Sequence, residues 1–410
     1  MSKLALLGGT KAAADLPLPR WPQCTSGDVQ AVTEALTSSR WCRIYPGSRV
    51  EQFERAFAEF QGGEHAVAVC NGTAALELAL QAAGVRPGDE VLVPAVTFIA
   101  SASAVTRVGA VPVFVDSDPE RIAVSAQALA AAITPRTSAI MVVHYGGYPP
   151  DMDAVVALAG ERRLALIEDC AHAQGGQWRE RGLGTLGTAG AFSFQESKSL
   201  AGGEGGMVLT NDAVVIERAR LLHNIGRVVG RPGYEHYVLA SNYRLPELQG
   251  ALLLSQLERL PEQVRLRQEA GEYLRQGLAS VEGLRPLPSD ERITRRGYYF
   301  FVLRYQPEAF PGVHRDRFLQ ALSAEGVPCG AGYGVPLYRQ PAFRRENVGP
   351  LYPRGASLPD YESLRLPVAE RFCYEEQITL PQPVLLGGRE AAVTVLAAIE
   401  KVMANIGELR

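Results

Sequence analysis

Hydrophobic residues between positions 66 and 210 occur in short runs that are apolar at consecutive positions. These runs lie at 66–70, 90–94, 111–116, 138–143, 164–169, 189–194 and 206–210. Helical stretches separate most of them, at about 71–80, 97–108, 125–132, 151–160 and 212–223. Strands that are apolar on both faces and separated by helices predict an α/β fold with a mostly parallel sheet between helices.

The pattern is different on either side of this region. Two helices are predicted before it, at 26–38 and 48–61, and the first begins with an N-cap sequence at Ser26. After about residue 249 we expect a long helix at 248–274 broken near Pro261, a strand at 298–303, and helices at about 314–325, 361–372 and 389–405. The pattern therefore predicts a large domain over 1–250, including the N-terminal segment, and a small C-terminal α+β domain over 251–410.

Composition narrows the functional classes. The chain has 410 residues, a formal net charge of -3 and no run of Lys or Arg longer than two residues, which argues against a nucleic-acid partner. The N-terminal apolar patch is too short for a signal peptide, and no stretch reaches transmembrane length. The six cysteines are scattered, so neither a disulfide framework nor a metal site is indicated. We expect a cytoplasmic protein that acts on small molecules away from membranes.

Lys198 is the most informative single residue. The chain has 41 Lys and Arg residues, but only four are lysines, and Lys198 is the only one between Lys11 and Lys401. Arginine cannot replace lysine where an amine must lose its proton and form an imine with a carbonyl compound. Lys198 is therefore a candidate catalytic residue, although a solvated surface lysine is an equally good interpretation of the residue taken alone.

Polar residues follow several of the predicted strands, where an open parallel sheet binds its ligands. Thr73 and Ala74 belong to a turn that leads from a strand into a helix, and the N–H groups of a helix N-terminus favour phosphate. Asp169 ends a buried strand, where an ionised carboxylate needs a positive partner. Ser193 lies five residues before Lys198. Each feature alone also has a structural explanation, as a helix start or a turn cap.

Taken together, these features suggest pyridoxal 5'-phosphate as cofactor. Its aldehyde needs a lysine to hold it as an imine, and its phosphate needs a helix N-terminus and hydroxyl groups such as those of Thr73 and Ser193. A carboxylate at Asp169 would raise the pKa of the pyridine nitrogen and keep it protonated. Phe98 follows a predicted strand and could cover the ring, although a lone Phe is more often part of a core.

Several motifs resemble the DegT/DnrJ/EryC1/StrS family of fold type I pyridoxal phosphate enzymes, the sugar and cyclitol aminotransferases. The matching stretches are 71–76, 94–100, 151–153, 168–173, 192–194, Lys198, 203–207 and 242–244. The resemblance covers nearly the whole chain and implies that Lys198 carries the cofactor and that Asp169 pairs with its ring nitrogen. Similar sugar 3-dehydratases carry His at the position of Lys198, so its presence implies transamination.

The resemblance also implies roles for other residues. His172 would lie beside the cofactor ring, and the Thr73 and Ala74 backbone with the Ser193 hydroxyl would bind its phosphate. Asn242 is expected to reach the phosphate of the neighbouring subunit's cofactor, which implies a homodimer with shared active sites.

Two further residues are candidates for substrate contact. Arg244 would either contact the carboxylate of the amino donor or brace the dimer. Tyr333 is the other candidate. It lies in the stretch 332–341, which departs from the His-Tyr-x-Pro-Leu-His pattern of many nucleotide-sugar enzymes.

The resemblance also bears on the substrates. The stretches 144–147 and 194–198 look more like the branch that acts on ketocyclitols and aminohydroxybenzoate precursors. The predicted reaction transfers an amino group from L-glutamine or L-glutamate to the ketone of a cyclitol or sugar, in aminoglycoside or other secondary-metabolite biosynthesis. The alternatives are a nucleotide-diphospho-ketosugar aminotransferase and a non-catalytic regulatory protein that binds pyridoxal phosphate.

Overall fold

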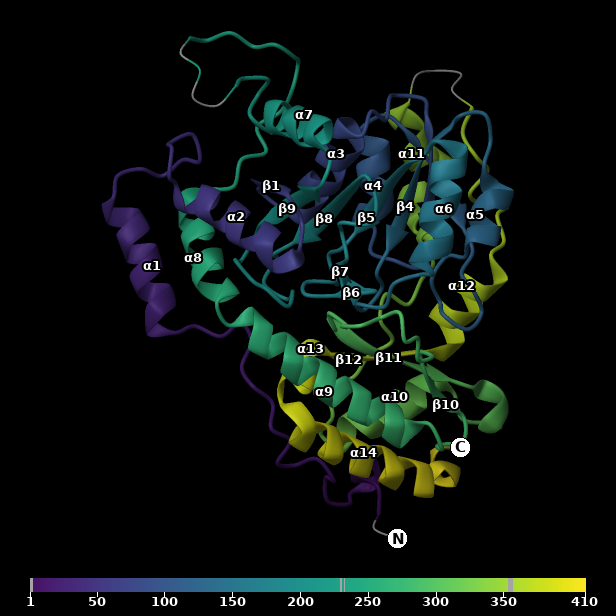
Figure 1. The fold of residues 1–410 in the computed structure, drawn as a ribbon. Coiled ribbons are helices and arrows are strands. Elements are labelled where there is room, and N and C mark those ends of the chain that lie inside the picture. The colour runs from purple at the N-terminus through teal and green to yellow at the C-terminus, as the bar shows by residue number, and fades with distance from the viewer. Residues whose placement is uncertain (1–2, 229–230, 232, 353–356) are drawn as a thin grey trace.

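A computed structural model describes residues 3–228, 231, 233–352 and 357–410 (Figure 1). A seven-stranded sheet occupies the centre of the larger part of the molecule. Its spatial order is β1 (His65–Val69), β9 (Gly206–Thr210), β8 (Ala189–Ser193), β5 (Ala165–Asp169), β4 (Thr137–Val143), β2 (Glu90–Pro94) and β3 (Val111–Val115). Only β9 runs in the direction opposite to the other strands of this sheet, which confirms the predicted mostly parallel arrangement.

Helices cover both faces of this sheet because consecutive strand residues point to opposite sides. Val67 and Val69 contribute to one buried cluster, together with side chains of α3 (Gly72–Ala82), α4 (Ala100–Arg107) and α7 (Ala213–His223). The other face packs against a second group of helices. They are α2 (Arg49–Gln61), α5 (Ala126–Ala132), α6 (Met152–Arg162) and α8 (Glu247–Leu257).

A smaller antiparallel sheet forms the centre of the C-terminal part. Its order is β10 (Leu284–Pro286), β11 (Phe300–Tyr305) and β12 (Gln377–Pro381). It shares a buried cluster with α9 (Leu260–Leu278), α10 (Arg315–Ala324), α13 (Gln382–Leu386) and α14 (Gly388–Ala404). The remaining regular elements are α1 (Ser26–Thr37), the hairpin of β6 (Gln177–Trp178) and β7 (Arg181–Gly182), and the short helices α11 (Arg345–Val348) and α12 (Pro367–Arg371).

The N-terminal segment packs against this C-terminal part. Glu325 is fully buried and accepts hydrogen bonds from the backbone N–H groups of Ala5 and Ala12, each at 2.8 Å. Its second oxygen also accepts a hydrogen bond from the Lys401 amine at 2.8 Å. The predicted domain boundary near residue 250 stays a prediction. The N-terminal segment nevertheless forms hydrogen bonds with Glu325, which lies beyond that boundary.

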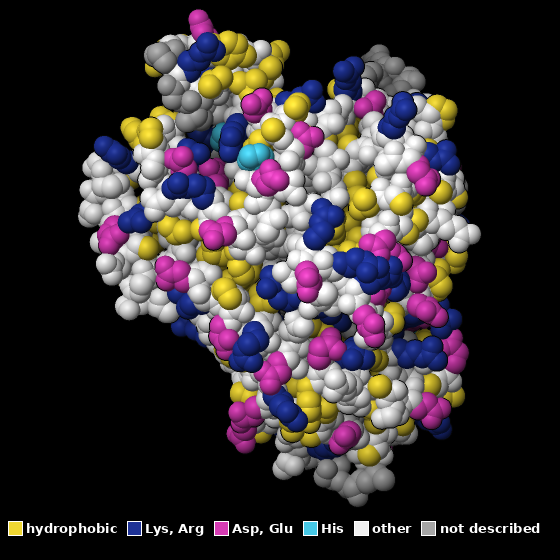
Figure 2. Space-filling view, in the orientation of Figure 1, with side chains coloured by type: hydrophobic (Ala, Val, Ile, Leu, Met, Phe, Trp, Pro, Cys, Tyr) yellow, Lys and Arg dark blue, Asp and Glu magenta, His cyan; other side chains and the backbone are white. Residues whose placement is uncertain are grey.

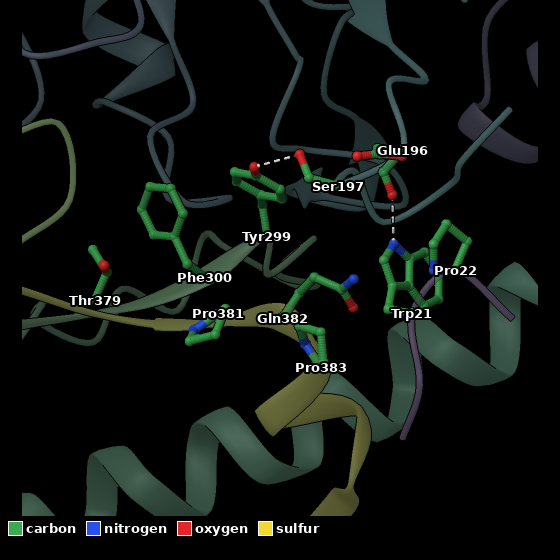
Figure 3. A pocket seen from close by; sticks show the side chains of 10 residues that line it. All are labelled: Trp21, Pro22, Glu196, Ser197, Tyr299, Phe300, Thr379, Pro381, Gln382 and Pro383. Atoms are coloured by element: carbon green, nitrogen blue, oxygen red, sulfur yellow. Dashed lines mark hydrogen bonds between the residues drawn. The ribbon is translucent and has the colours of Figure 1, made fainter. Parts of the chain in front are cut away.

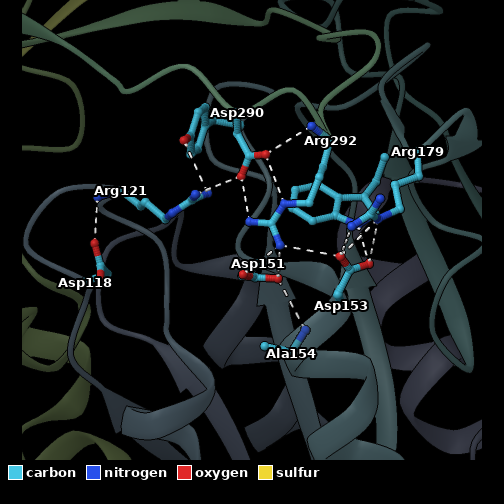
Figure 4. A network of polar contacts seen from close by, with 10 residues as sticks. Asp118, Arg121, Asp151, Asp153, Ala154, Arg179, Asp290 and Arg292 are labelled. Atoms are coloured by element: carbon cyan, nitrogen blue, oxygen red, sulfur yellow. Dashed lines mark hydrogen bonds and ion pairs between the residues drawn. The ribbon is translucent and has the colours of Figure 1, made fainter.

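A network of ion pairs joins the two parts at a second place (Figure 4). Arg292, in the segment that leads into β11, donates to Asp151 at the start of α6 and to Asp290. Arg121 also donates to Asp290 at 2.7 Å. Hydrogen bonds from Arg292 hold the pKa of Asp290 well below its usual range. The carboxylate therefore stays ionised and keeps both arginines in place.

Most of the predicted elements are confirmed, with two corrections. The predicted break near Pro261 in the helix at 248–274 is confirmed, because α8 ends at Leu257, α9 begins at Leu260, and Pro261 lies in the first turn of α9, where its missing N–H costs nothing. Instead of the predicted helix at 361–372, the structure has the short helix α12, which is followed by a π-helical turn over Phe372–Glu376. Helix α4 begins at Ala100 and not near 97, so Phe98 lies in a loop.

None of the helices in the described part of the chain combines the length and hydrophobicity that a bilayer span requires.

Candidate active site

A cavity of about 840 Å³ lies at the carboxyl ends of the central strands. It brings together all but one of the residues predicted from the sequence. These are Thr73, Ala74, Phe98, Asp169, His172, Ser193, Lys198, Asn242 and Tyr333. Arg244 does not line the cavity. The strand ends therefore converge on one site, as expected for an open parallel sheet.

Lys198 reaches this cavity from the loop after β8. Its Nζ lies 4.2 Å from the centroid of the Tyr299 ring. Burial lowers the pKa of the amine to about 8, and the nearby Asp169 carboxylate opposes this effect. The unprotonated fraction of the amine near neutral pH is therefore much larger than that of an exposed lysine, which favours a nucleophilic role.

Asp169 faces the same cavity from the end of β5 and is 5% exposed. One carboxylate oxygen accepts a hydrogen bond from the Ser101 hydroxyl at 2.7 Å, and the other accepts from the backbone N–H of Ala171 at 3.1 Å. Burial raises the pKa of Asp169, whereas these hydrogen bonds and Lys198 counteract the rise. Within the described part of the chain Asp169 forms no salt bridge, and the Lys198 amine acts on it only by longer-range attraction.

The turn before α3 forms the second end of the cavity. The Asn71 side chain caps α3, because its oxygen accepts a hydrogen bond from the Ala74 N–H at 2.8 Å. This N–H therefore already has an acceptor, whereas the sequence predicted that it would bind phosphate. The N–H of Thr73 has no acceptor among the described residues. A side chain at Gly72 would place its Cβ 2.6 Å from the Cβ of Ser193. Glycine therefore lets the helix N-terminus approach the Ser193 hydroxyl, which makes a cradle suited to phosphate.

His172 is stacked on Tyr299, with ring centroids 4.3 Å apart. Burial lowers the pKa of His172 well below 6.5, so the ring is neutral. Its Nδ1 accepts from the Gly146 N–H at 3.4 Å, which assigns the proton to Nε2. Nε2 then donates to the Tyr333 hydroxyl at 3.1 Å. The hydroxyl proton of Tyr333 is left to donate to a ligand.

The other predicted residues lie at the edge of the site. Phe98 is 51% exposed and its ring centroid is 5.8 Å from that of Tyr333. Asn242 lines the cavity of its own chain, and its side-chain oxygen accepts from the backbone N–H of Arg244 at 3.3 Å. The Arg244 guanidinium donates to the Asn224 side chain at 2.8 Å. The predicted contacts of Asn242 across a dimer and of Arg244 with the amino donor remain predictions.

Sequence reasoning missed two residues that shape the site. Ser101 orients Asp169 and itself lies 3.0 Å from the Thr97 hydroxyl. Thr97 precedes α4, which begins at Ala100, so the bend at residues 95–97 and not a helical repeat brings the two hydroxyls together. Tyr299, the residue before β11, covers Lys198 from a segment about a hundred residues further along the chain. No local pattern reveals such a contact.

Glu168 precedes Asp169 but has a structural role. It is fully buried and accepts from the backbone N–H groups of Gly184, Leu186 and Gly187 and lies 3.0 Å from the His144 ring. These bonds fix the 184–187 turn beside the end of β5. Although Glu168, His144 and Cys170 lie close together, the carboxylate is already satisfied by the protein.

Comparison with known proteins places this site in a family context. Residues 22–397 match the DegT/DnrJ/EryC1/StrS aminotransferase family. The L-glutamine:2-deoxy-scyllo-inosose aminotransferase of Micromonospora echinospora is 39% identical over 428 residues, which cover 100% of both chains. A protein of Streptoalloteichus tenebrarius, provisionally named an L-glutamine:3-amino-2,3-dideoxy-scyllo-inosose aminotransferase, is 38% identical over 415 residues and also covers 100% of both chains.

A solved structure gives the same result for the fold. The crystal structure of 3-amino-5-hydroxybenzoic acid synthase is 36% identical, covers 95% of this chain and 99% of its own, and has a TM-score of 0.84. A half-buried lysine and a buried carboxylate at the strand ends of this fold define the class of the protein, which is an aminotransferase. The chain belongs to the DegT/DnrJ/EryC1/StrS aminotransferase family, and the predictions of fold, family and enzyme class are confirmed.

Proposed function

We propose that the protein is a pyridoxal-phosphate-dependent aminotransferase that moves an amino group from L-glutamine to the ketone of a cyclitol in aminoglycoside-type biosynthesis. The observation that carries the proposal is that Lys198 and Asp169 line one cavity in a chain whose full-length relatives are named for L-glutamine and scyllo-inososes. L-Glutamate, which the sequence left open as donor, is the comparison substrate.

The residues of the cavity fit the proposed cofactor. The phosphate of the cofactor could accept hydrogen bonds from the unpaired N–H of Thr73 and from the Ser193 hydroxyl. Gly72 lets these two groups lie close together. Asp169 offers a carboxylate without a counter-ion for a protonated ring nitrogen. Phe98 lies on the wall, where it could cover the ring. When bound, the cofactor supplies an aldehyde that takes up an amino group and a ring that withdraws electrons.

The protein's own residues would then bind, orient and move protons. Lys198, with a pKa of about 8, can release and accept a proton near neutral pH. Ser101 holds the Asp169 carboxylate in one orientation through a 2.7 Å hydrogen bond. The neutral His172 ring donates a hydrogen bond to the Tyr333 hydroxyl. The proton of that hydroxyl can then orient a substrate oxygen. The stacked rings of Tyr299 and His172 would keep water from the Lys198 amine.

The proposal includes a homodimer. Hydrophobic side chains gather on the loop that protrudes after α7, at the upper left of the molecule (Figure 2). The exposed members with described positions are Val228, Tyr234, Tyr237, Val238 and Leu239. A loop of this composition is unfavourable in water and suits a protein interface. Because Asn242 directly follows this loop, a second copy bound there would lie close to the catalytic cavity.

The half-reactions test the proposed function. Protein purified with pyridoxal phosphate should lose the visible absorbance of the bound cofactor when L-glutamine is added, and a ketoinositol should restore it. L-Glutamate and a nucleotide ketosugar are run in parallel, so that the preferred donor and acceptor are both measured. Lys198→Ala is the control and should show neither change. Absorbance that persists with every amino acid contradicts the proposal and favours a non-catalytic cofactor-binding protein.

A further inference from the structure

The loop that carries Lys198 is held by a relay of hydrogen bonds. The amide oxygen of Gln195 accepts from the backbone N–H of Ser197 at 2.9 Å and from the Ser197 hydroxyl at 2.6 Å. Because this hydroxyl gives its proton to Gln195, its oxygen accepts from the Tyr299 hydroxyl at 2.9 Å (Figure 3). The relay therefore joins the loop to the segment that leads into β11.

Further bonds fix the backbone of the same loop. The Trp21 indole N–H donates to the backbone oxygen of Glu196 at 2.9 Å, which Figure 3 also shows. The backbone N–H of Lys198 donates to the backbone oxygen of Gln195 at 2.8 Å. Gln195 and Lys198 therefore belong to one tight turn that is held from two sides.

The relay determines which way the Gln195 amide faces. A backbone N–H can only donate, so the atom that accepts from Ser197 is the amide oxygen and not the NH2 group. The NH2 group has no hydrogen-bond partner in the described part of the chain, and it is not among the unpaired atoms that are closed off from solvent. Gln195 lines the catalytic cavity but not the neighbouring cavity of about 390 Å³, which Ser197 and Tyr299 also line. Its NH2 group is therefore an oriented donor on the catalytic side.

The charges around this donor indicate what it binds. The charged side chains that line the catalytic cavity in the described ranges are three carboxylates and one amine, those of Glu77, Asp169, Glu204 and Lys198. None of the described lining residues is an arginine, the residue that best pairs with a diphosphate. The uncharged donors are the Gln195 NH2 group and the Tyr333 hydroxyl. Neutral donors of this kind suit the hydroxyl oxygens of an uncharged ring.

We propose that the Gln195 NH2 group binds a ring hydroxyl of the amino acceptor and so selects polyhydroxylated ring ketones. The inference rests on the proposed function, in which the ketone must react beside Lys198. Because Gln195 lies in the same tight turn as Lys198, a ring that reacts there brings its hydroxyls to the Gln195 side of the cavity. A site built to bind a hydroxyl discriminates against an analogue that lacks it. Ser197 and Tyr299 are positioning residues that act through the Gln195 oxygen.

Acceptors with and without hydroxyls test this role. In Gln195→Met, the ketoinositol concentration that restores half of the absorbance after bleaching should rise roughly 3- to 10-fold, as expected for one lost hydrogen bond between neutral groups. With cyclohexanone, which has the ketone but no hydroxyl, the variant and the wild type should agree within about twofold. An equal loss with both acceptors means that the variant only disturbs the loop, and it overturns the inference. Gln195→Ala repeats the comparison, and Gln276→Met on the exposed face of α9 is the matched control.

The donor half-reaction separates the other possible ligand, the carboxylate of the amino acid. The L-glutamine concentration for half-maximal bleaching should stay within about twofold of wild type in Gln195→Met. A weakened donor step with an unchanged acceptor step overturns the inference and assigns the NH2 group to that carboxylate.

A double variant tests the positioning role of Tyr299. Tyr299→Phe keeps the ring but removes the hydroxyl that donates to Ser197, so ketoinositol should bind more weakly. In Gln195→Met the relay has no amide to orient, and adding Tyr299→Phe should cause no further rise in the ketoinositol concentration. Losses that multiply in the double variant contradict the relay.

The proposed function and this inference fail in different ways. If the wild type bleaches with L-glutamine and Gln195→Met needs no more ketoinositol than the wild type, the role of Gln195 alone is overturned. If the wild type does not bleach, or cyclohexanone restores no absorbance in it, calorimetric titration of the cofactor-loaded protein with scyllo-inositol decides the role of Gln195. Weaker binding in Gln195→Met supports the hydroxyl contact, and equal affinities overturn it.

Discussion

Lys198 and Asp169 owe their properties to the same burial. Removal from water favours the neutral form of both groups, which lowers the pKa of the amine and raises that of the carboxyl. Each group opposes the effect on the other, because a nearby opposite charge favours ionisation. Ser101 and the Ala171 N–H add two hydrogen bonds that favour the carboxylate. The site therefore holds an amine that can lose its proton beside an acid that can keep its charge.

A prediction at the residue scale follows from these signs. The rate at which cyanate carbamylates Lys198 in cofactor-free protein should rise with pH through about 8, since only the free amine reacts. In Asp169→Asn the apparent pKa should fall further, because the attraction that raises it is lost. Mass spectrometry of the modified peptide measures the rate, with Lys11 as an internal comparison. A pKa that rises in Asp169→Asn contradicts the assigned coupling.

The element that depends most on a single small residue is α3. Its N-terminus can lie beside Ser193 only because position 72 has no Cβ, and Asn71 caps the helix without covering the Thr73 N–H. The sequence indicated a helix start after a strand, which is a local pattern. It did not reveal that the cap uses the Ala74 N–H, because the choice between ligand and cap depends on the Asn71 side-chain orientation.

Gly72→Ala tests the role of this helix start. The added Cβ would lie 2.6 Å from the Cβ of Ser193, so the backbone must shift and widen the cradle. We expect unfolding free energy to fall by about 1–3 kcal/mol and pyridoxal phosphate affinity to fall with it. Gly160→Ala in α6 is the control, because its site is open and the helix should gain about 0.5–1 kcal/mol. Urea denaturation and a cofactor titration measure both effects, and unchanged affinity in Gly72→Ala would contradict the cradle.

At the scale of the whole molecule, segments far apart in the sequence complete the catalytic surroundings. Tyr299 and Tyr333 come from the C-terminal part, and Trp21 comes from the N-terminal segment. Glu325 and the Arg292 network hold these parts against one another. The apolar loop after α7 is not covered by its own chain, and Leu239 is fully exposed there, at 101%.

The proposed homodimer can be tested at this loop. Leu239→Asp should shift the protein from dimer to monomer in analytical ultracentrifugation, because an interface cannot bury an unpaired carboxylate without cost. Val393→Asp on α14, at the opposite end of the molecule in Figure 1, should leave the dimer intact. A wild-type protein that sediments as a monomer contradicts the proposal.

The sequence by itself determined the sheet, the order of most helices and the lysine and aspartate at the strand ends. Apolar runs and helical periods are local, and the carboxyl ends of parallel strands must meet at one edge, so these features can be predicted without coordinates. Only the tertiary structure decided which groups surround them. Ser101 as the partner of Asp169, Tyr299 over Lys198, and the Tyr299 hydroxyl bonded to Ser197 are contacts between distant segments. Side-chain packing sets such contacts, and no spacing along the chain encodes them.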